Sequence, residues 1–236
     1  MKENILKNKF EIIIFIIEAI CMSLELIASR VLSPYFGNSN IVWTSVIGII
    51  LLSSSIGNYI GGKIADKNEN ERNLKIITIF AAACILVIPI IQENLLKYIS
   101  VTINDVKIGA IISTIILFFI PSIWLGTIIP IILKIKLNNL DNTGKIAGKI
   151  YAISTIGGIF GTFFSGFFLI PNFGSIQILF VLSILLLLLS LTIYKNKIIS
   201  LLCIATLLII NISLLWFYSN NNIQYGELVL SGDTRC

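Results

Sequence analysis

The chain begins with an apolar segment that is long enough to cross a bilayer and yet carries charged residues. Residues 9–32 read KFEIIIFIIEAICMSLELIASRVL, where Glu18, Glu25 and Arg30 interrupt a run of Ile, Leu, Phe and Ala. A span of about 20 apolar residues matches the hydrocarbon core of a membrane. A charge near the middle of such a span costs about 3 kcal/mol on insertion scales and therefore usually faces protein or water. The segment predicts a membrane protein whose first helix has a functional inward face.

The rest of the chain has the composition of a membrane protein. Of its 236 residues, 56% are hydrophobic and 12% are charged, whereas soluble domains carry about 25% charged residues. The apolar runs predict about seven spans, at residues 12–32, 41–62, 74–96, 108–133, 150–170, 175–194 and 198–218. They lack the period-two alternation of barrel strands, so helices are expected. We expect an all-α polytopic membrane protein with a helical bundle over residues 1–218 and a short polar tail over residues 219–236.

The distribution of basic residues predicts an orientation in the cell membrane. The stretches before span one and after spans two, four and six, together with Lys75 at the start of span three, hold 13 of the 17 Lys and Arg residues. Four remain for the other side: Arg30, Lys97, Lys107 and Arg235. The positive-inside rule then places the N-terminus in the cytoplasm and, with seven spans, the C-terminus outside.

Composition also excludes several classes of function. The net charge of +5 is dispersed over predicted cytoplasmic loops, as the positive-inside rule expects, so we expect no nucleic acid partner. The chain has no histidine, and its four cysteines are not spaced as metal ligands or as a disulfide framework. An intramembrane enzyme would also lack a nucleophile–base pair. We therefore expect no catalytic residues, no metal and no cofactor within these residues, and the lipid bilayer as the principal partner.

Glu18 and Glu25 share one face of the first helix. They are seven residues apart, about 700° of helical rotation, which returns them to within about 20° of each other. Two stacked carboxylates can bind a cation, relay protons or pair with basic residues of other helices. Arg30 is too far around the helix for a regular bridge to Glu25, and it either snorkels to the interface or holds another acid.

Aromatic residues follow the first span and recur in the fourth. Tyr35 and Trp43 are predicted to lie at the outer interface, and Trp124 lies within span four. An aromatic belt at the interface explains the first two residues. The alternative is a cage that binds an organic cation by cation–π attraction of about 1–2 kcal/mol.

Glycine pairs mark spans two and five. Gly57 and Gly61 are four residues apart, as are Gly157 and Gly161, so each pair lies on one helix face and allows a second helix to approach closely. The pairs indicate helix packing, and the alternative is that these faces slide during transport. In span four, Pro121 and Pro130 predict either a kink or a broken helix that lines a path.

The segment GGKIADK after span two resembles the loop motif of the major facilitator superfamily. In that motif glycine, aspartate and a basic residue join helices two and three, and Gly62, Asp66 and Lys67 match its first half. The later Gly-Arg-Lys part of the motif is replaced in this chain. We expect Gly62 to permit close packing, and Asp66 to accept from backbone amides or from an arginine at a neighbouring helix end.

Three stretches together resemble the membrane half of the bacterial fused transporter/spermidine-synthase-like proteins. They are ELIASRVLSPYFGNSNIVWTSVIG, GNYIGGKIADK and GKIAGKIYAISTIGGIFGTFFSGFFLIPNFG, within residues 18–174. In that family a facilitator-like N-terminal helical bundle precedes an aminopropyltransferase-like domain that uses decarboxylated S-adenosylmethionine. The tail QYGELVLSGDTRC is similar to the approach to that domain. The Gly-rich loop and soluble carboxylates of the synthase are not in this chain, so aminopropyl transfer is not assigned to it.

Two functions follow from these observations. The first is a transporter-like protein for a small cationic solute such as a polyamine. Glu18 and Glu25 would neutralise the solute, with Tyr35, Trp43 or Trp124 beside it. A transporter of this size is expected to form a homodimer, by analogy with larger facilitators. The alternative is a non-transporting membrane anchor for a separately encoded synthase-like or methyltransferase-like protein; a truncated family member is the other explanation of the missing domain.

Overall fold

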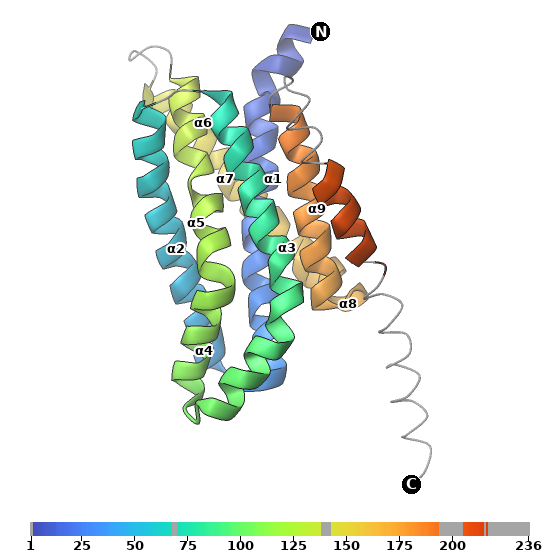
Figure 1. Ribbon diagram of the computed structural model, residues 1–236. Helices are drawn as coiled ribbons and strands as arrows, with labels where there is room; N and C mark the ends of the chain where they lie inside the picture. The colour runs from blue at the N-terminus through green and yellow to red at the C-terminus, as the bar shows by residue number, and fades with distance from the viewer. Residues whose placement is uncertain (1, 68–69, 138–142, 194–204, 215, 217–236) are drawn as a thin grey trace.

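The structure is a bundle of long helices that run roughly side by side (Figure 1). It is a computed structural model that describes residues 2–67, 70–137, 143–193, 205–214 and 216. No strand occurs among these residues. Three of the spans are single helices: α1 (Lys2–Phe36), α2 (Asn40–Lys67) and α3 (Glu71–Thr102). The sixth, α9 (Ser175–Ile193), is also unbroken.

Spans four and five are each built from several helical segments. Span four, Val106–Lys136, consists of α4 (Val106–Thr114), the π-helical segment Ile115–Phe119, α5 (Ile120–Gly126) and α6 (Ile128–Lys136). Span five, Thr143–Asn172, consists of α7 (Thr143–Phe164), the π-helical segment Ser165–Leu169 and α8 (Ile170–Asn172).

The six helices match the first six predicted spans, and the all-α polytopic class is confirmed. The helices extend past the predicted ends because polar residues continue them beyond the apolar window; α3, for example, runs to Thr102. Of the predicted seventh span, 198–218, the structure describes the short apolar helix Ala205–Leu214 and Trp216. The rest of that span and the polar tail lie outside the described residues.

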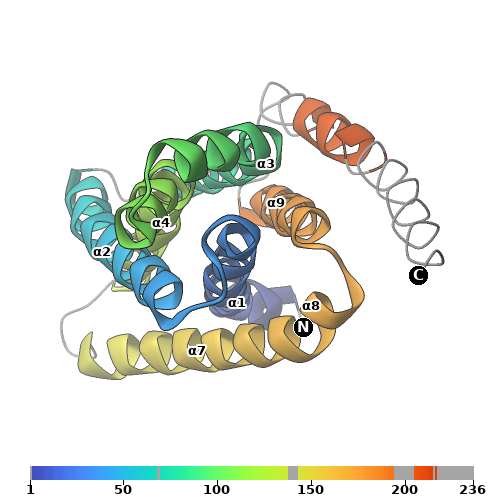
Figure 2. The ribbon, with the colours of Figure 1, turned by 90° about the horizontal axis from the view of Figure 1, so that it is seen from below.

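Helix α1 is enclosed by the other spans. Figure 2, seen along the bundle, shows it inside a ring formed by α2, α4, α3, α9 and α7. Apolar residues at many positions around α1 are therefore fully buried: Ile13, Ile14, Ile17, Ile20, Leu24, Ile27 and Ala28 are at most 1% exposed. A helix that is hydrophobic on all sides is expected at such a position. Any polar residue on α1 must then be accommodated by neighbouring helices.

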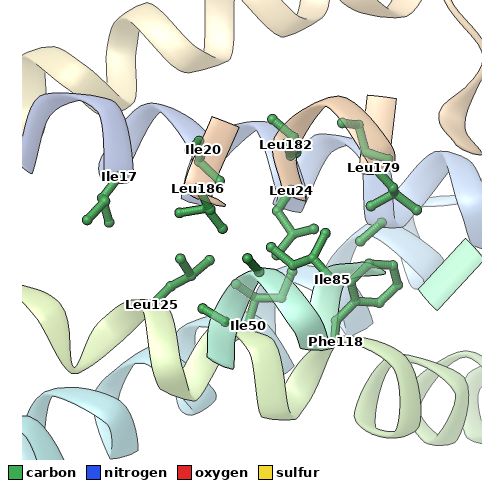
Figure 3. Close-up of a cluster of buried hydrophobic side chains, with 14 of the residues drawn as sticks. Ile17, Ile20, Leu24, Ile50, Ile85, Phe118, Leu125, Leu179, Leu182 and Leu186 are labelled. Atoms are coloured by element: carbon green, nitrogen blue, oxygen red, sulfur yellow. The ribbon is translucent and has the colours of Figure 1, made fainter. Parts of the chain in front are cut away.

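Branched and aromatic side chains from several helices meet around α1. Figure 3 shows Ile17, Ile20 and Leu24 of α1 facing residues of other spans. The labelled partners are Ile50, Ile85, Phe118, Leu125, Leu179, Leu182 and Leu186. Because lipid chains are as apolar as these side chains, burial itself gives little driving force in a membrane, and close van der Waals contact has to stabilise the bundle.

One close helix contact joins α7 to α1. A Cβ placed on Gly157 would clash with the backbone of Phe15, and one on Gly161 would meet the Cα of Ala19 at 2.5 Å. One turn further on, the Ser165 hydroxyl donates to the Ser23 hydroxyl at 2.6 Å. Positions 157, 161 and 165 of span five thus contact positions 15, 19 and 23 of α1. Contacts repeated every four residues between small side chains are typical of closely packed membrane helices.

A second close contact joins α2 to span four. A Cβ on Gly57 would clash with the carbonyl of Ile123, and one on Gly61 would lie 2.5 Å from the carbonyl oxygen of Thr127. On the facing helix, a Cβ on Gly126 would meet the carbonyl oxygen of Ser54 at 2.7 Å. Both glycine pairs thus lie at helix crossings, in the places where the packing interpretation requires them.

Prolines follow both π-helical segments. The segment Ile115–Phe119 ends two residues before Pro121, and Ser165–Leu169 ends two residues before Pro171. A proline lacks an N–H and its ring clashes with the preceding turn, and a wider π turn accommodates that change without ending the helix. Span four also has a turn at Thr127, whose hydroxyl donates to the carbonyl of Trp124 at 2.7 Å. Span four is therefore locally deformed at its prolines but stays helical.

One end of the bundle carries a cluster of ion pairs, which we call the basic end. Glu11 accepts from Lys136 at 3.2 Å and from Lys149 at 2.7 Å. Lys9 pairs with Glu71 at 2.9 Å. These bonds connect α1 to α6, α7 and α3, so the basic segments between the spans gather at one end. Which end faces the cytoplasm stays a prediction.

We predict that alanine at position 161 destabilises the protein, because the new Cβ would force α7 away from α1. Overpacking of this kind costs about 1–3 kcal/mol. The matched control is Gly148→Ala, also in α7, where a Cβ meets no atom within 4 Å. The measurement is unfolding of both variants in detergent micelles; equal stability of the two would contradict the close contact.

We also predict that Glu11→Gln lowers the free energy of unfolding by about 1–2 kcal/mol, because charge-assisted hydrogen bonds to a shared carboxylate are lost. The Glu11 side chain is 16% exposed. Glu93→Gln is the control, since Glu93 and its partner Lys97 are 60% and 62% exposed, and exposed pairs contribute about 0–1 kcal/mol. The same denaturation assay compares the two, and a larger effect at Glu93 would refute this ranking.

Candidate functional site

Glu18 lies in a groove between α1 and α7. The groove has a volume of about 370 Å³, and its α1 side is formed by Glu18 and Met22. Glu18 is nine residues beyond Lys9, the first residue of the 28-residue membrane span Lys9–Phe36, and thus lies about 14 Å along the helix axis from that end. The groove thus contains a carboxylate that lies inside a membrane span.

The α7 side of the groove carries hydroxyl groups. It is formed by Ser154, Thr155, Gly158, Ile159, Thr162 and Phe163. Thr155 donates to the carbonyl of Tyr151, and Thr162 to that of Gly158, both at 2.9 Å. Because these hydroxyl hydrogens are used within the helix, the oxygens remain available as acceptors. Carboxylate and hydroxyl acceptors together suit a ligand that brings positive charge and N–H donors.

Gly158 leaves the space that the groove occupies. A Cβ at this position would lie 3.2 Å from the Cγ of Met22, so a larger side chain would fill part of the groove. Gly157 and Gly161 on either side hold the helices in contact, and Gly158 is buried between them without such a backbone contact. The groove is therefore a direct consequence of the way α7 crosses α1.

Neither Glu18 nor Glu25 has a basic partner in the part of the chain that the structure describes. Every ion pair found there, within 4.0 Å, involves Glu11, Asp66, Glu71 or Glu93. The ion-pair alternative for Glu25 thus has no counterpart among the described residues. Glu18 and Glu25 are both half-buried and remain available to a ligand or to protons.

Residues on the face of α1 that carries both glutamates line two separate cavities. Glu18 and Met22 line the groove beside α7, and Ser29, further along the same stripe, lines a cavity at the opposite end of the helix. Glu25 lies between them in the sequence. This stripe is the one that the seven-residue spacing predicts.

The other predicted binding residues lie away from Glu18. Arg30 and Trp43 line the cavity that Ser29 also lines. The Arg30 guanidinium donates to the carbonyl of Ile170 at 3.2 Å, and the Trp43 indole donates to Asn38 at 3.1 Å. Tyr35 lines a second, adjoining cavity. None of these side chains is among those that line the Glu18 groove.

Trp124 is separated from the others by its position in α5. Its ring packs on that of Phe80 of α3, with centroids 5.3 Å apart. None of Tyr35, Trp43 and Trp124 lines the Glu18 groove, so these aromatic residues do not surround Glu18.

The loop motif after α2 differs from expectation in two respects. A Cβ at Gly62 would meet no atom within 4 Å, so the close packing predicted for Gly62 is wrong; Gly61, one residue earlier, makes the contact instead. Asp66 pairs with Lys134 of α6 at 3.4 Å, so its partner at a neighbouring helix end is a lysine rather than an arginine. Lys67 is the last residue of α2 and is exposed.

Sequence reasoning did not identify the hydroxyl residues of α7. Thr155 and Thr162 are seven residues apart, the same spacing that singled out Glu18 and Glu25, and a helical wheel would have placed them on one face. It would not have placed that face against Glu18. Among the described residues no group of three or more His, Cys, Asp or Glu side chains lies close enough to hold a metal ion.

Comparisons with known proteins do not assign the chain to a family. No protein family, curated protein or solved structure matches the chain. The conclusions that stand are therefore those of the fold itself. This is a multi-pass membrane protein whose central helix carries Glu18 and Glu25 within its membrane span, and Glu18 lies in a groove lined by hydroxyl groups.

Proposed function

We propose that this multi-pass membrane protein is transporter-like and binds a small cationic solute, such as a polyamine, in the groove beside Glu18. The observation that carries the proposal is a carboxylate inside a membrane span, in a groove of about 370 Å³, with no basic partner among the described residues. A groove of this volume falls in the range of small-molecule sites, about 300–1,000 Å³.

The chemistry of the groove favours an amine over other cations. An ammonium group offers only N–H donors, and the groove offers the Glu18 carboxylate with the hydroxyl oxygens of Thr155 and Thr162 as acceptors. In a low-dielectric site a cation must be paired with an opposite charge, and Glu18 supplies it. Met22 and Phe163 give the same groove an apolar wall, which suits the methylene chain of an organic amine.

The stripe on α1 supports movement as well as binding. A solute that leaves Glu18 along this face would meet the second carboxylate, Glu25, about two helical turns further on. Two carboxylates in series let a cation stay neutralised at two depths in the membrane. The resemblance to fused transporter/synthase-like proteins agrees with this proposal, and a homodimer would supply a number of helices comparable to a full facilitator, by analogy alone.

We predict that spermidine and putrescine stabilise the detergent-purified protein in a saturable way, and that Glu18→Gln abolishes this effect because the counter-charge is removed. At a ligand concentration 100 times the Kd, stabilisation reaches about 2.7 kcal/mol. The measurement is thermal unfolding over an amine titration. Glu25→Gln is expected to reduce the stabilisation by amines less than Glu18→Gln does. It should nevertheless lower the uptake of labelled amine into proteoliposomes.

Two further variants control this experiment. Glu93→Gln removes an exposed acid outside the groove and should behave as wild type. Gly158→Val leaves every charge in place but narrows the groove beside Met22, so it should weaken amine binding if the groove is the site. Wild-type protein that no amine stabilises would contradict the proposal and favour the anchoring role, which predicts co-purification with a synthase-like partner.

A further inference from the structure

Two adjoining cavities lie at the end of α1 opposite the basic end, and Arg30 lines both. One has a volume of about 370 Å³ and the other about 240 Å³. They share Arg30, Pro34 and Ser175, so that the arginine and the start of α9 form their common wall. We call this pair of cavities the Arg30 pocket.

The charge of Arg30 is not neutralised by any described carboxylate. Its one recorded hydrogen bond goes to a backbone carbonyl, that of Ile170, which leaves most of its N–H donors free. The described acids at this end have other roles: Glu93 pairs with Lys97 at 2.6 Å, and Asp105 caps α4 by accepting from the backbone N–H of Lys107 at 2.8 Å. A guanidinium in this state is suited to bidentate binding of a carboxylate or phosphate.

The start of α9 adds to the preference for an anion. Ser175 is the first residue of this helix of 19 residues, and Ser175 and Ile176 line the pocket. The first N–H groups of a helix have no partner within the helix and carry partial positive charge. The N-terminus of α9 and the guanidinium of Arg30 thus both border the Arg30 pocket.

Gln92 supplies an independent indication of a ligand. Its side chain comes from α3, lines the smaller cavity and is only 6% exposed. Its amide oxygen has no hydrogen-bond partner. A buried acceptor without a donor costs about 1–3 kcal/mol, so this position calls for an O–H or N–H group from a bound molecule.

We infer that the Arg30 pocket binds a phosphate ester that carries a free hydroxyl group, with the phosphate on Arg30 and the hydroxyl on Gln92. Ser33 and Asn38 line the larger cavity and add further polar contacts; the indole of Trp43 holds the Asn38 side chain in place. Because the pocket lies near one end of a membrane span, such a group can come from a lipid head group or from a soluble ester. The cation groove at Glu18 is a separate site.

The test is thermal unfolding of the detergent-purified full chain with chosen probes at constant ionic strength. Soluble probes are glycerol 3-phosphate and inorganic phosphate, with sodium chloride as the blank. The lipid probes are mixed micelles that contain phosphatidylglycerol or phosphatidylcholine. We expect saturable stabilisation by glycerol 3-phosphate if the source is soluble, and by phosphatidylglycerol alone if the source is a lipid.

Three variants assign the effect to the pocket. Arg30→Gln should abolish stabilisation, whereas Lys107→Gln, which removes a positive charge near the same end, should leave it unchanged. Gln92→Leu replaces the unpartnered amide by a side chain of similar size, so folding is retained; it should lower the response to the hydroxyl-bearing probe towards that of inorganic phosphate. The inference is overturned if no probe stabilises the wild type, or if Arg30→Gln responds as the wild type does.

Discussion

The close approach of α7 to α1 at Gly157 and Gly161 is the contact on which the rest of the bundle depends. Helices in lipid gain little from burying apolar surface, and they associate where small residues let backbones meet. Here α7 rests on the backbone of Phe15 and Ala19, and the equivalent contact of α2 with span four holds the other side. With α1 fixed at the centre, α3 and α9 complete the ring around it.

This packing also determines where polar groups can lie inside the bundle. The crossing that brings Ala19 against Gly161 places Glu18 beside the hydroxyls of α7, and it lets Ser165 bond to Ser23. Hydroxyls of this kind satisfy their hydrogens on the carbonyl one turn earlier, so they present acceptors to the groove. A carboxylate in such surroundings lacks a donor, and a cationic ligand is what would supply one.

The two ends of the bundle differ in how their charges are arranged. At the basic end Glu11 joins Lys136 and Lys149, and Lys9 joins Glu71, so these carboxylates pair with lysines of other helices. At the opposite end Arg30 is bound only to a carbonyl and faces two cavities. Paired charges at a helix end hold neighbouring spans together, whereas a charge that no described acid neutralises is available to a ligand.

The sequence by itself determined the class of the protein and its first six spans. Span length and hydropathy are local properties of the chain, and the thickness of the bilayer sets the length that a span must have. The sequence also determined that Glu18 and Glu25 share a face, since helical periodicity is local too. Only the tertiary structure decided what that face meets. Three findings depend on which helices cross and at which residues. Thr155 and Thr162 lie beside Glu18, Gly61 rather than Gly62 lies at a helix crossing, and Trp124 is separate from Trp43. Those choices arise from contacts between residues far apart in the chain, which no local pattern contains.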